Sequence, residues 1–193
     1  RIHITDAKGQ VQFADHDMDG QRSNYANFSF FKEAQQKSTD QLFVTKLIRD
    51  PNGQGWVHLF ARRYNQGDGT FAGMIITALP ASYFNHLIAE LDVGPKGVVL
   101  VQDLDMRVIA RNPMLKTPNG KVGFVGGPPE LSQLVHSGAQ SGTIYTRRTT
   151  DKIPRIGNFR KLSSMPIFVV VAFGEKDYLA QWYEDVIKAV LLG

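Results

Sequence analysis

The first 37 residues change from one hydrophobic periodicity to another. Apolar and polar positions alternate through residues 1–15 around an Ala-Lys-Gly turn, which predicts a β-hairpin. Residues 23–37 then change to helical spacing, and we expect a short helix there that opens at Ser23 or Asn24, both good N-cap types. Three residues share one side of this helix: Phe28, Phe31 and Ala34.

The next stretch predicts an antiparallel meander followed by a helix. Three apolar, β-branched segments are separated by an Asp-Pro-Asn-Gly turn and a Gly-Asp-Gly turn, and they cover residues 40–50, 56–64 and 70–79. Strands joined by such tight turns pair antiparallel. Residues 80–92 then begin with a proline, which suits the first turn of a helix.

The same order of patterns occurs a second time. Residues 98–111 repeat the hairpin pattern, and residues 153–182 repeat strand, turn, strand and helix. Four residue pairs match at a spacing of about 100 residues: Asp6 with Asp103, Val11 with Val108, Phe60 with Phe159, and Tyr83 with Tyr178. A spacing this constant indicates an internal duplication of one α+β module.

The repeat sets the expected domain organisation. We place the boundary near residues 91–95, which gives one module over 1–91 and a second over 92–193. Each module is expected to be an antiparallel sheet of about five strands flanked by helices. Residues 112–130 are rich in glycine and proline and predict a loop.

Composition narrows the function classes. The chain is 42% hydrophobic and 21% charged, as in ordinary folded proteins. Its net charge of +4 is scattered along the chain, which argues against a nucleic-acid surface. There is no cysteine, so disulfides and thiol catalysis are excluded. No run of about 18 apolar residues occurs, and the apolar C-terminus suggests the start of a longer helix.

Metal and catalytic motifs are weak or missing. Residues 15–20 read Asp-His-Asp-Met-Asp-Gly, like the opening of a calcium loop, but Ala26 stands where that loop needs its bidentate carboxylate. We therefore expect no tight calcium site and no metal site. The five histidines have no zinc-ligand spacing, and no serine-nucleophile or phosphate-loop motif occurs. The chain is expected to be non-catalytic, without a cofactor.

One strand carries an unusual set of side chains. His58, Phe60 and Arg62 alternate along residues 56–64 and share a face, while Arg63 points the other way. The phenyl ring of Phe60, the imidazole of His58 and the guanidinium of Arg62 suit a pocket for a carboxylate or phosphate. A solvent-facing surface explains the same pattern, because antiparallel sheets often leave one face wet. The opposite face, with Val57, Leu59 and Ala61, is typical of a core.

The order of these elements resembles the double Cache family, the tandem PAS-like sensor domains outside the cytoplasm in bacterial transmembrane receptors. "FARRYNQGDGTFAGMIITALPASYF" looks like the strand pair of the membrane-distal module in the branch attached to GGDEF diguanylate cyclases or histidine kinases. "LDVGPKGVVLVQDLDMRVIARNP" looks like part of the membrane-proximal module. The resemblance covers nearly the whole chain through weak motifs in the right order.

The chain departs from this family in three places. The branch has a charged Asp-Arg-Asp-Tyr-Phe-like helix start, where this chain has Asn27-Phe28-Ser29-Phe30-Phe31. Amino-acid-sensing relatives have an aspartate near the end of the last distal strand, where this chain has Ala78. An α-amino-acid ligand is therefore disfavoured. The long helix that precedes the distal module in the family is not found in this sequence.

The resemblance implies a periplasmic sensor domain that binds a small molecule in the distal module and passes the signal through the C-terminal helix. A carboxylate or other anion is the expected ligand, a homodimer is a possible state of the full receptor, and flanking helices attach it to the membrane. Cyclase, kinase and chemotaxis outputs all remain open. The expected ligand-binding residues are Phe30, Phe31, Phe43, Thr45, His58, Phe60 and Arg62.

An alternative function fits the same sequence. Four phenylalanines could fill the distal pocket themselves: Phe28, Phe30, Phe31 and Phe43. The chain would then be a structural or partner-binding module that senses no small molecule.

Overall fold

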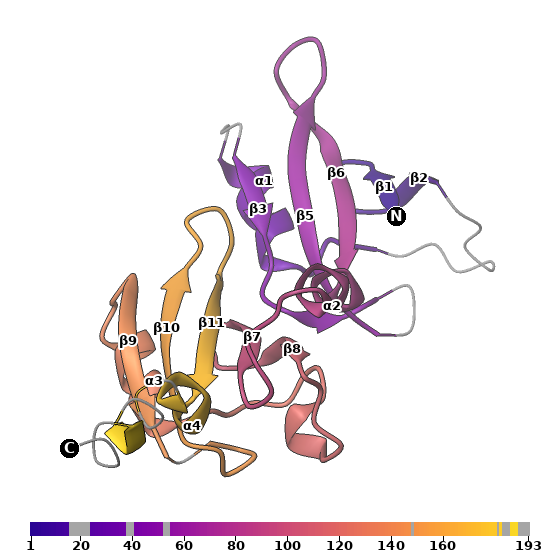
Figure 1. Cartoon of the computed structure of the whole chain (residues 1–193). Helices are drawn as coiled ribbons and strands as arrows, with labels where there is room; N and C mark the ends of the chain where they lie inside the picture. Colours follow the sequence, from indigo (N-terminus) through magenta and orange to yellow (C-terminus); the bar gives the residue numbers. More distant parts are fainter. Residues whose placement is uncertain are drawn as a thin grey trace. The chain divides into compact units, whose positions relative to one another are not determined.

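The computed structural model describes residues 1–15, 24–37, 41–51, 55–147, 149–180, 182 and 186–188. The chain divides into two compact units, Arg1–Tyr83 and Phe84–Gly193. Each unit has its own antiparallel sheet and short helices, and none of the described strands pairs with a strand of the other unit (Figure 1). The fold is α+β with two tandem PAS-like modules, as the sequence repeat predicts.

The first sheet confirms the predicted hairpin and meander. Its strands lie in the order β2-β1-β6-β5-β3, and β4 also pairs with β5. The elements are β1 (Ile2–Thr5), β2 (Val11–Ala14), α1 (Ser29–Gln36), β3 (Leu42–Val44), β4 (Ile48–Arg49), β5 (Trp56–Asn65), β6 (Phe71–Pro80) and α2 (Ala81–Ala89).

The single strand expected over residues 40–50 is two strands instead. Both β3 and β4 pair with β5, and Thr45 lies between them. The Thr45 hydroxyl accepts the Leu59 backbone N–H at 2.9 Å, in place of a backbone carbonyl. This side-chain acceptor interrupts the ladder, as threonine can do wherever its hydroxyl reaches the backbone.

Helix α1 begins later than the sequence indicates. Its N-cap is Phe28, which makes no side-chain capping bond. Asn24 instead uses its side-chain oxygen to accept the Ala26 N–H at 2.8 Å, which closes a local turn ahead of the helix. The expected N-cap at Asn24 is therefore wrong, and Ser23 lies outside the described residues.

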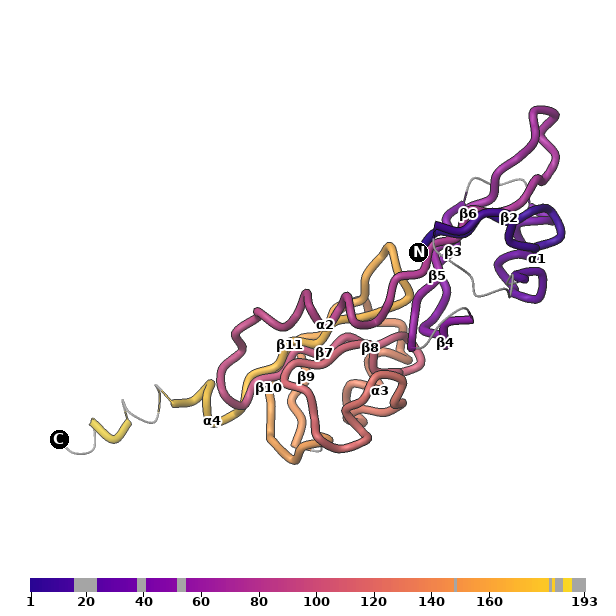
Figure 2. Tube along the Cα trace, turned by 90° about the vertical axis from the view of Figure 1, so that its right-hand side faces the viewer, coloured from indigo at the N-terminus to yellow at the C-terminus, as the bar shows by residue number. Residues whose placement is uncertain are grey.

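The second sheet repeats the strand order of the first. Its order is β8-β7-β11-β10-β9, which matches β2-β1-β6-β5-β3 strand for strand. Figure 2 shows α3 on one side of this sheet and α2 on the other. The elements are β7 (Val98–Asp103), β8 (Val108–Asn112), the 3-10 helix η1 (Pro118–Gly120), α3 (Pro129–His136), β9 (Ser141–Thr146), β10 (Arg155–Lys161), β11 (Ile167–Gly174) and α4 (Glu175–Tyr178).

Each module has a separate hydrophobic core. Helix α1 supplies Phe30, Phe31 and Ala34 to the first core, where they meet alternate residues of β5 and β6. Helix α3 supplies Leu131 and Val135 to the second core. Both cores lie between a sheet and the helix that connects its second strand to its third.

The four matched pairs lie at corresponding elements of the two modules, but one pair differs in the face of the strand that it occupies. Val11 and Val108 begin corresponding strands and are both buried. Phe60 and Phe159 also lie on corresponding strands, but Phe159 is in the second core and Phe60 faces away from the first. Successive side chains of a strand alternate between faces, so an offset wrong by one residue reverses the face.

Helix α2 accounts for the difference between the expected and the observed boundary. The sequence places the boundary after this helix, whereas contacts place it before Phe84. The side-chain amide of Asn112 donates to the carbonyls of Ile88 and Ala89, at 2.9 and 3.2 Å, which ties the end of α2 to β8. Among the described residues, no helix has the length and apolar character needed to cross a membrane.

Candidate ligand-binding sites

The first sheet has an inner face, which α1 covers, and an outer face. The inner face carries Val57, Leu59 and Ala61 of β5, which confirms the core face expected from the sequence. Three of the expected ligand-binding residues lie in this core: Phe30, Phe31 and Phe43, with 6%, 0% and 6% of their surfaces exposed. They pack against the sheet as hydrophobic core residues.

A hydrogen bond links His58 to Thr45. The His58 ring nitrogen Nδ1 lies 2.9 Å from the Thr45 carbonyl oxygen, so Nδ1 carries the proton and donates. His58 is completely buried. This hydrogen bond joins the connection between β3 and β4 to the middle of the sheet.

Arg62 does not face α1. From the sequence we expected Arg62, His58 and Phe60 to share one face of the strand and to line a ligand pocket. The structure places α1 against the alternate residues of β5, so these three lie on the outer face, and Arg62 is exposed. The two-residue period of the strand was correct, but the helix covers the other side.

Arg63, rather than Arg62, faces α1. Its Nη1 group donates to the carbonyl of Ala34 at 2.9 Å and also to that of Lys37, at the C-terminal end of the helix. Its Nε and Nη2 groups donate to the Asn65 side chain, and its guanidinium lies over the Phe71 ring. A cation at a helix C-terminus satisfies carbonyls that have no partner within the helix. Arg63 therefore anchors α1.

A buried polar pair on the inner face was not found from the sequence. His3 Nδ1 lies 2.8 Å from the Tyr25 hydroxyl, and these residues are 4% and 1% exposed. Tyr25 packs on the rings of Phe28 and Phe30 at centroid distances of 5.5 and 6.5 Å. The only signal in the sequence was His3 at an inward position of the first strand.

The metal prediction concerns a segment that is mostly outside the described residues. Asp17 and Asp19 are not described, while Asp15 accepts the Ile2 backbone N–H through its side chain at 2.9 Å. Within the described part of the chain, no group of three acidic or histidine side chains is placed to hold a metal ion.

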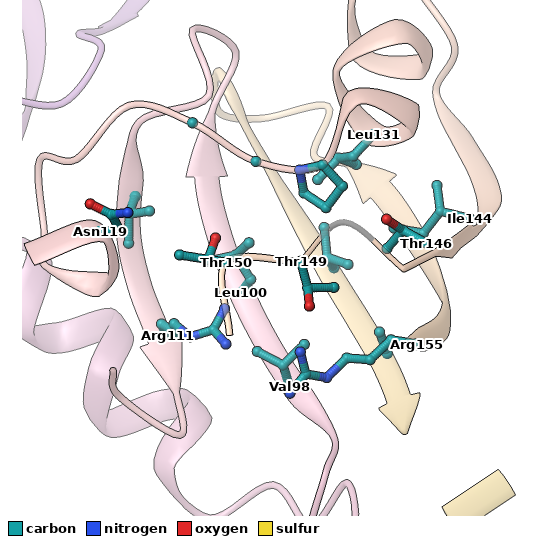
Figure 3. A pocket seen from close by; sticks show the side chains of 16 residues that line it. Val98, Leu100, Arg111, Asn119, Leu131, Ile144, Thr146, Thr149, Thr150 and Arg155 are labelled. Atoms are coloured by element: carbon teal, nitrogen blue, oxygen red, sulfur yellow. The ribbon is translucent and has the colours of Figure 1, made fainter. Parts of the chain in front are cut away.

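The second module contains a cavity of about 40 Å³ between its sheet and the loops that lead into and out of α3 and β9. Part of its wall is apolar, with Val98 and Leu100 of β7 at the base. Six polar side chains also line it: Arg111, Asn119, Thr146, Thr149, Thr150 and Arg155. Figure 3 shows Arg111 and Arg155 reaching from opposite sides toward the strand that carries Val98 and Leu100.

One carboxylate joins the two arginines. Asp151 accepts two hydrogen bonds from Arg155, at 2.6 and 2.8 Å, and one from Nη2 of Arg111 at 2.8 Å. Burial alone would raise the pKa of Asp151, but the hydrogen bonds and charge of Arg155, helped by Arg111, lower it to about 2. The remaining Arg155 nitrogen, Nε, donates to the Lys96 carbonyl at 2.7 Å.

Among the described residues, Arg111 makes fewer hydrogen bonds than Arg155. It is 9% exposed, and burial lowers its pKa despite the nearby Asp151. Among the described residues, Nη2 is its one hydrogen-bonding nitrogen, and its buried Nε has no partner. The sequence could not reveal this group, because residues 111, 151 and 155 come together only through the sheet and its loop.

Comparisons with known proteins agree on the fold. The extracellular domain of a protein described as a histidine kinase, rpHK1S-Z16, aligns with 94% of this chain and 73% of its own length, with 24% identity and a TM-score of 0.75. The periplasmic sensory domain of the Campylobacter jejuni chemoreceptor Tlp1 aligns with 80% of this chain at 11% identity, with a TM-score of 0.60. This chain spans 59% of that structure.

A further solved structure is the ligand-binding domain of the Campylobacter jejuni chemoreceptor Tlp3 in complex with L-valine. It matches 91% of this chain at 12% identity with a TM-score of 0.55, and this chain spans 66% of it. No protein-family model matches the chain, and no curated protein matches it by sequence. The chain has the fold of tandem PAS-like, Cache-type sensory domains of histidine kinases and chemoreceptors.

Proposed function

We propose that this chain is the non-catalytic, small-molecule-sensing domain of a bacterial transmembrane receptor and that it lies outside the cytoplasm. The observation that carries the proposal is the repeated module, in which one face of each sheet is closed by its own helix. Solved proteins with this fold are extracellular or periplasmic sensory domains. Such a module can respond to a ligand that favours one arrangement of helix and sheet over another.

We place the ligand of the distal module between α1 and the inner face. The buried His3–Tyr25 pair supports this position, because it puts hydrogen-bonding groups among aromatic rings. Ala78, which packs against the same core, gives no carboxylate for a ligand amine. A small molecule without an ammonium group therefore fits better than the α-amino acid bound by Tlp3. The segment after β11 would pass the change toward the membrane.

The self-filled alternative has one observation in its favour. Phe30, Phe31 and Phe43 are all buried against the inner face. A ligand in the distal module must then share that space with these rings or move them.

Calorimetric titration separates the two functions. Compounds that raise the melting temperature of the chain are titrated into the parent, Tyr25→Phe and Arg62→Ala. If the ligand lies on the inner face, losing the Tyr25 hydroxyl should weaken binding about tenfold, as for one buried hydrogen bond, and the outer-face Arg62 variant should bind like the parent. Equal affinities in all three proteins would contradict the distal site.

A further inference from the structure

We propose that the second module has its own ligand site, in which the guanidinium of Arg111 binds the carboxylate of a short-chain aliphatic acid. The site is separate from the distal site proposed above and does not depend on it. Its support is geometric and comes from one cavity, one unpaired donor and one imbalance of charge.

The donor is the Nε–H group of Arg111. Arg111 lines the cavity, is 91% buried, and has no partner for Nε among the described residues. A buried donor without an acceptor is costly, so any acceptor that fits the cavity gains that free energy on binding. The Nε and Nη2 edge of a guanidinium is planar and matches a carboxylate.

The charges favour an anion over a neutral acceptor. Arg111 and Arg155 supply two positive charges, and among the described residues Asp151 is the carboxylate that bonds to both. Arg155 is fully engaged with Asp151 and the Lys96 carbonyl. The uncompensated positive charge is therefore at Arg111, where an anionic ligand would balance it.

The walls of the cavity limit the size and polarity of the rest of the ligand. Beside the polar side chains named above, the sheet side of the cavity presents aliphatic groups from Val98, Leu100, Val170 and Ala172. A volume of about 40 Å³ accommodates a few heavy atoms, which favours a short chain over a long chain or a ring. Together these features fit a small monocarboxylate such as acetate or propionate.

The test is titration of the whole chain with propionate, with propionamide as a neutral molecule of the same shape. We expect saturable propionate binding with a dissociation constant of about 1 mM or tighter, and none for propionamide. Acetate should also bind, and hexanoate should not. No saturable propionate binding would overturn the proposal, as would equal binding of propionamide.

Two variants locate the site. Arg111→Lys keeps the charge but removes the Nε edge, and Ala172→Val fills the cavity without changing any charge. Each should weaken propionate binding at least tenfold, while Arg160→Lys, on the exposed side of β10, should leave it unchanged. Circular dichroism checks that all three fold. Propionate binding that both cavity variants leave intact would place the carboxylate elsewhere and contradict the proposal.

Discussion

Asp6 and Asp103, which lie 97 residues apart, make the same backbone hydrogen bonds in two corresponding hairpins. The Asp6 carboxylate accepts the backbone N–H groups of Lys8 and Gln10, both at 2.9 Å. The Asp103 carboxylate accepts those of Asp105 and Arg107, at 3.0 and 2.8 Å. Each aspartate thus binds the residues two and four positions after it and closes the turn of its hairpin.

The two turns differ in burial, and this difference predicts their contributions to stability. Asp103 is completely buried, and burial raises its pKa, whereas Asp6 is partly exposed. Asp103→Ala should therefore lower the free energy of unfolding by about 1–3 kcal/mol, and Asp6→Ala by less, because water can replace the lost acceptor. Urea unfolding measures both, with Trp56 in the first unit and Trp182 in the second as probes.

The matching asparagine variants are the control. Asp103→Asn and Asp6→Asn keep an oxygen acceptor in each turn, so each should lose less stability than its alanine counterpart. Equal losses for asparagine and alanine would show that the turns do not depend on these hydrogen bonds.

Neighbouring arginines on β5 should behave differently. Arg63→Ala removes hydrogen bonds to the Ala34 and Lys37 carbonyls and should cost about 1–3 kcal/mol of stability in the first unit. Arg62→Ala, on the exposed outer face, is the matched control and should cost less. Denaturant unfolding measures the loss of stability in both variants, and a larger loss for Arg62→Ala than for Arg63→Ala would contradict the observed faces.

Acid should destabilise the second unit through Asp151. Its pKa is about 2 in the folded protein, below the ordinary 3.8, so the folded state binds fewer protons than the unfolded state. The stabilisation is complete above about pH 4 and is lost as the pH falls toward 2, by about 2 kcal/mol in all. Unfolding measured between pH 7 and pH 2 should show this slope.

Removing the Asp151 carboxylate tests whether this group causes the acid sensitivity. Asp151→Asn leaves two buried guanidinium groups without their counter-ion and should cost about 3–5 kcal/mol at neutral pH. It should also flatten the acid slope, while Glu90→Gln, an exposed acid, should change neither. An unchanged slope in Asp151→Asn would assign the acid sensitivity to other groups.

Calcium should not bind tightly at the acidic segment. Ala26 stands in place of the bidentate carboxylate, and the Asp15 side chain already accepts a backbone N–H. Calorimetry at millimolar calcium should show no saturable heat. A melting temperature that rises with calcium would contradict this prediction.

Much of the fold was predictable because turns and alternation are local signals. The hairpins, the meander and the repeat all follow from residues close together in the sequence. The covered face of β5 did not follow, because alternation separates two faces without saying which one receives the helix. Strand β9 and helix α3 also went unpredicted, and for α3 the reason is that the glycine- and proline-rich residues 112–130 run into its start.

The ligand sites were harder to predict for a related reason. The phenylalanines of α1 were found because they are neighbours in sequence, but the sequence left open whether they bind a ligand or fill the pocket themselves. The contact between Arg111 and Asp151 spans 40 residues, and that between His3 and Tyr25 spans 22. Such pairs depend on strand order, which a single sequence does not reveal.

Thermal unfolding of the unmodified chain with a panel of small neutral and anionic metabolites tests most directly whether it is a sensor. A true ligand binds the folded state and raises the melting temperature progressively with its concentration, as mass action requires. We predict that at least one compound does so. If no compound in the panel shifts the transition, the modules are filled by their own side chains and the sensing function is contradicted.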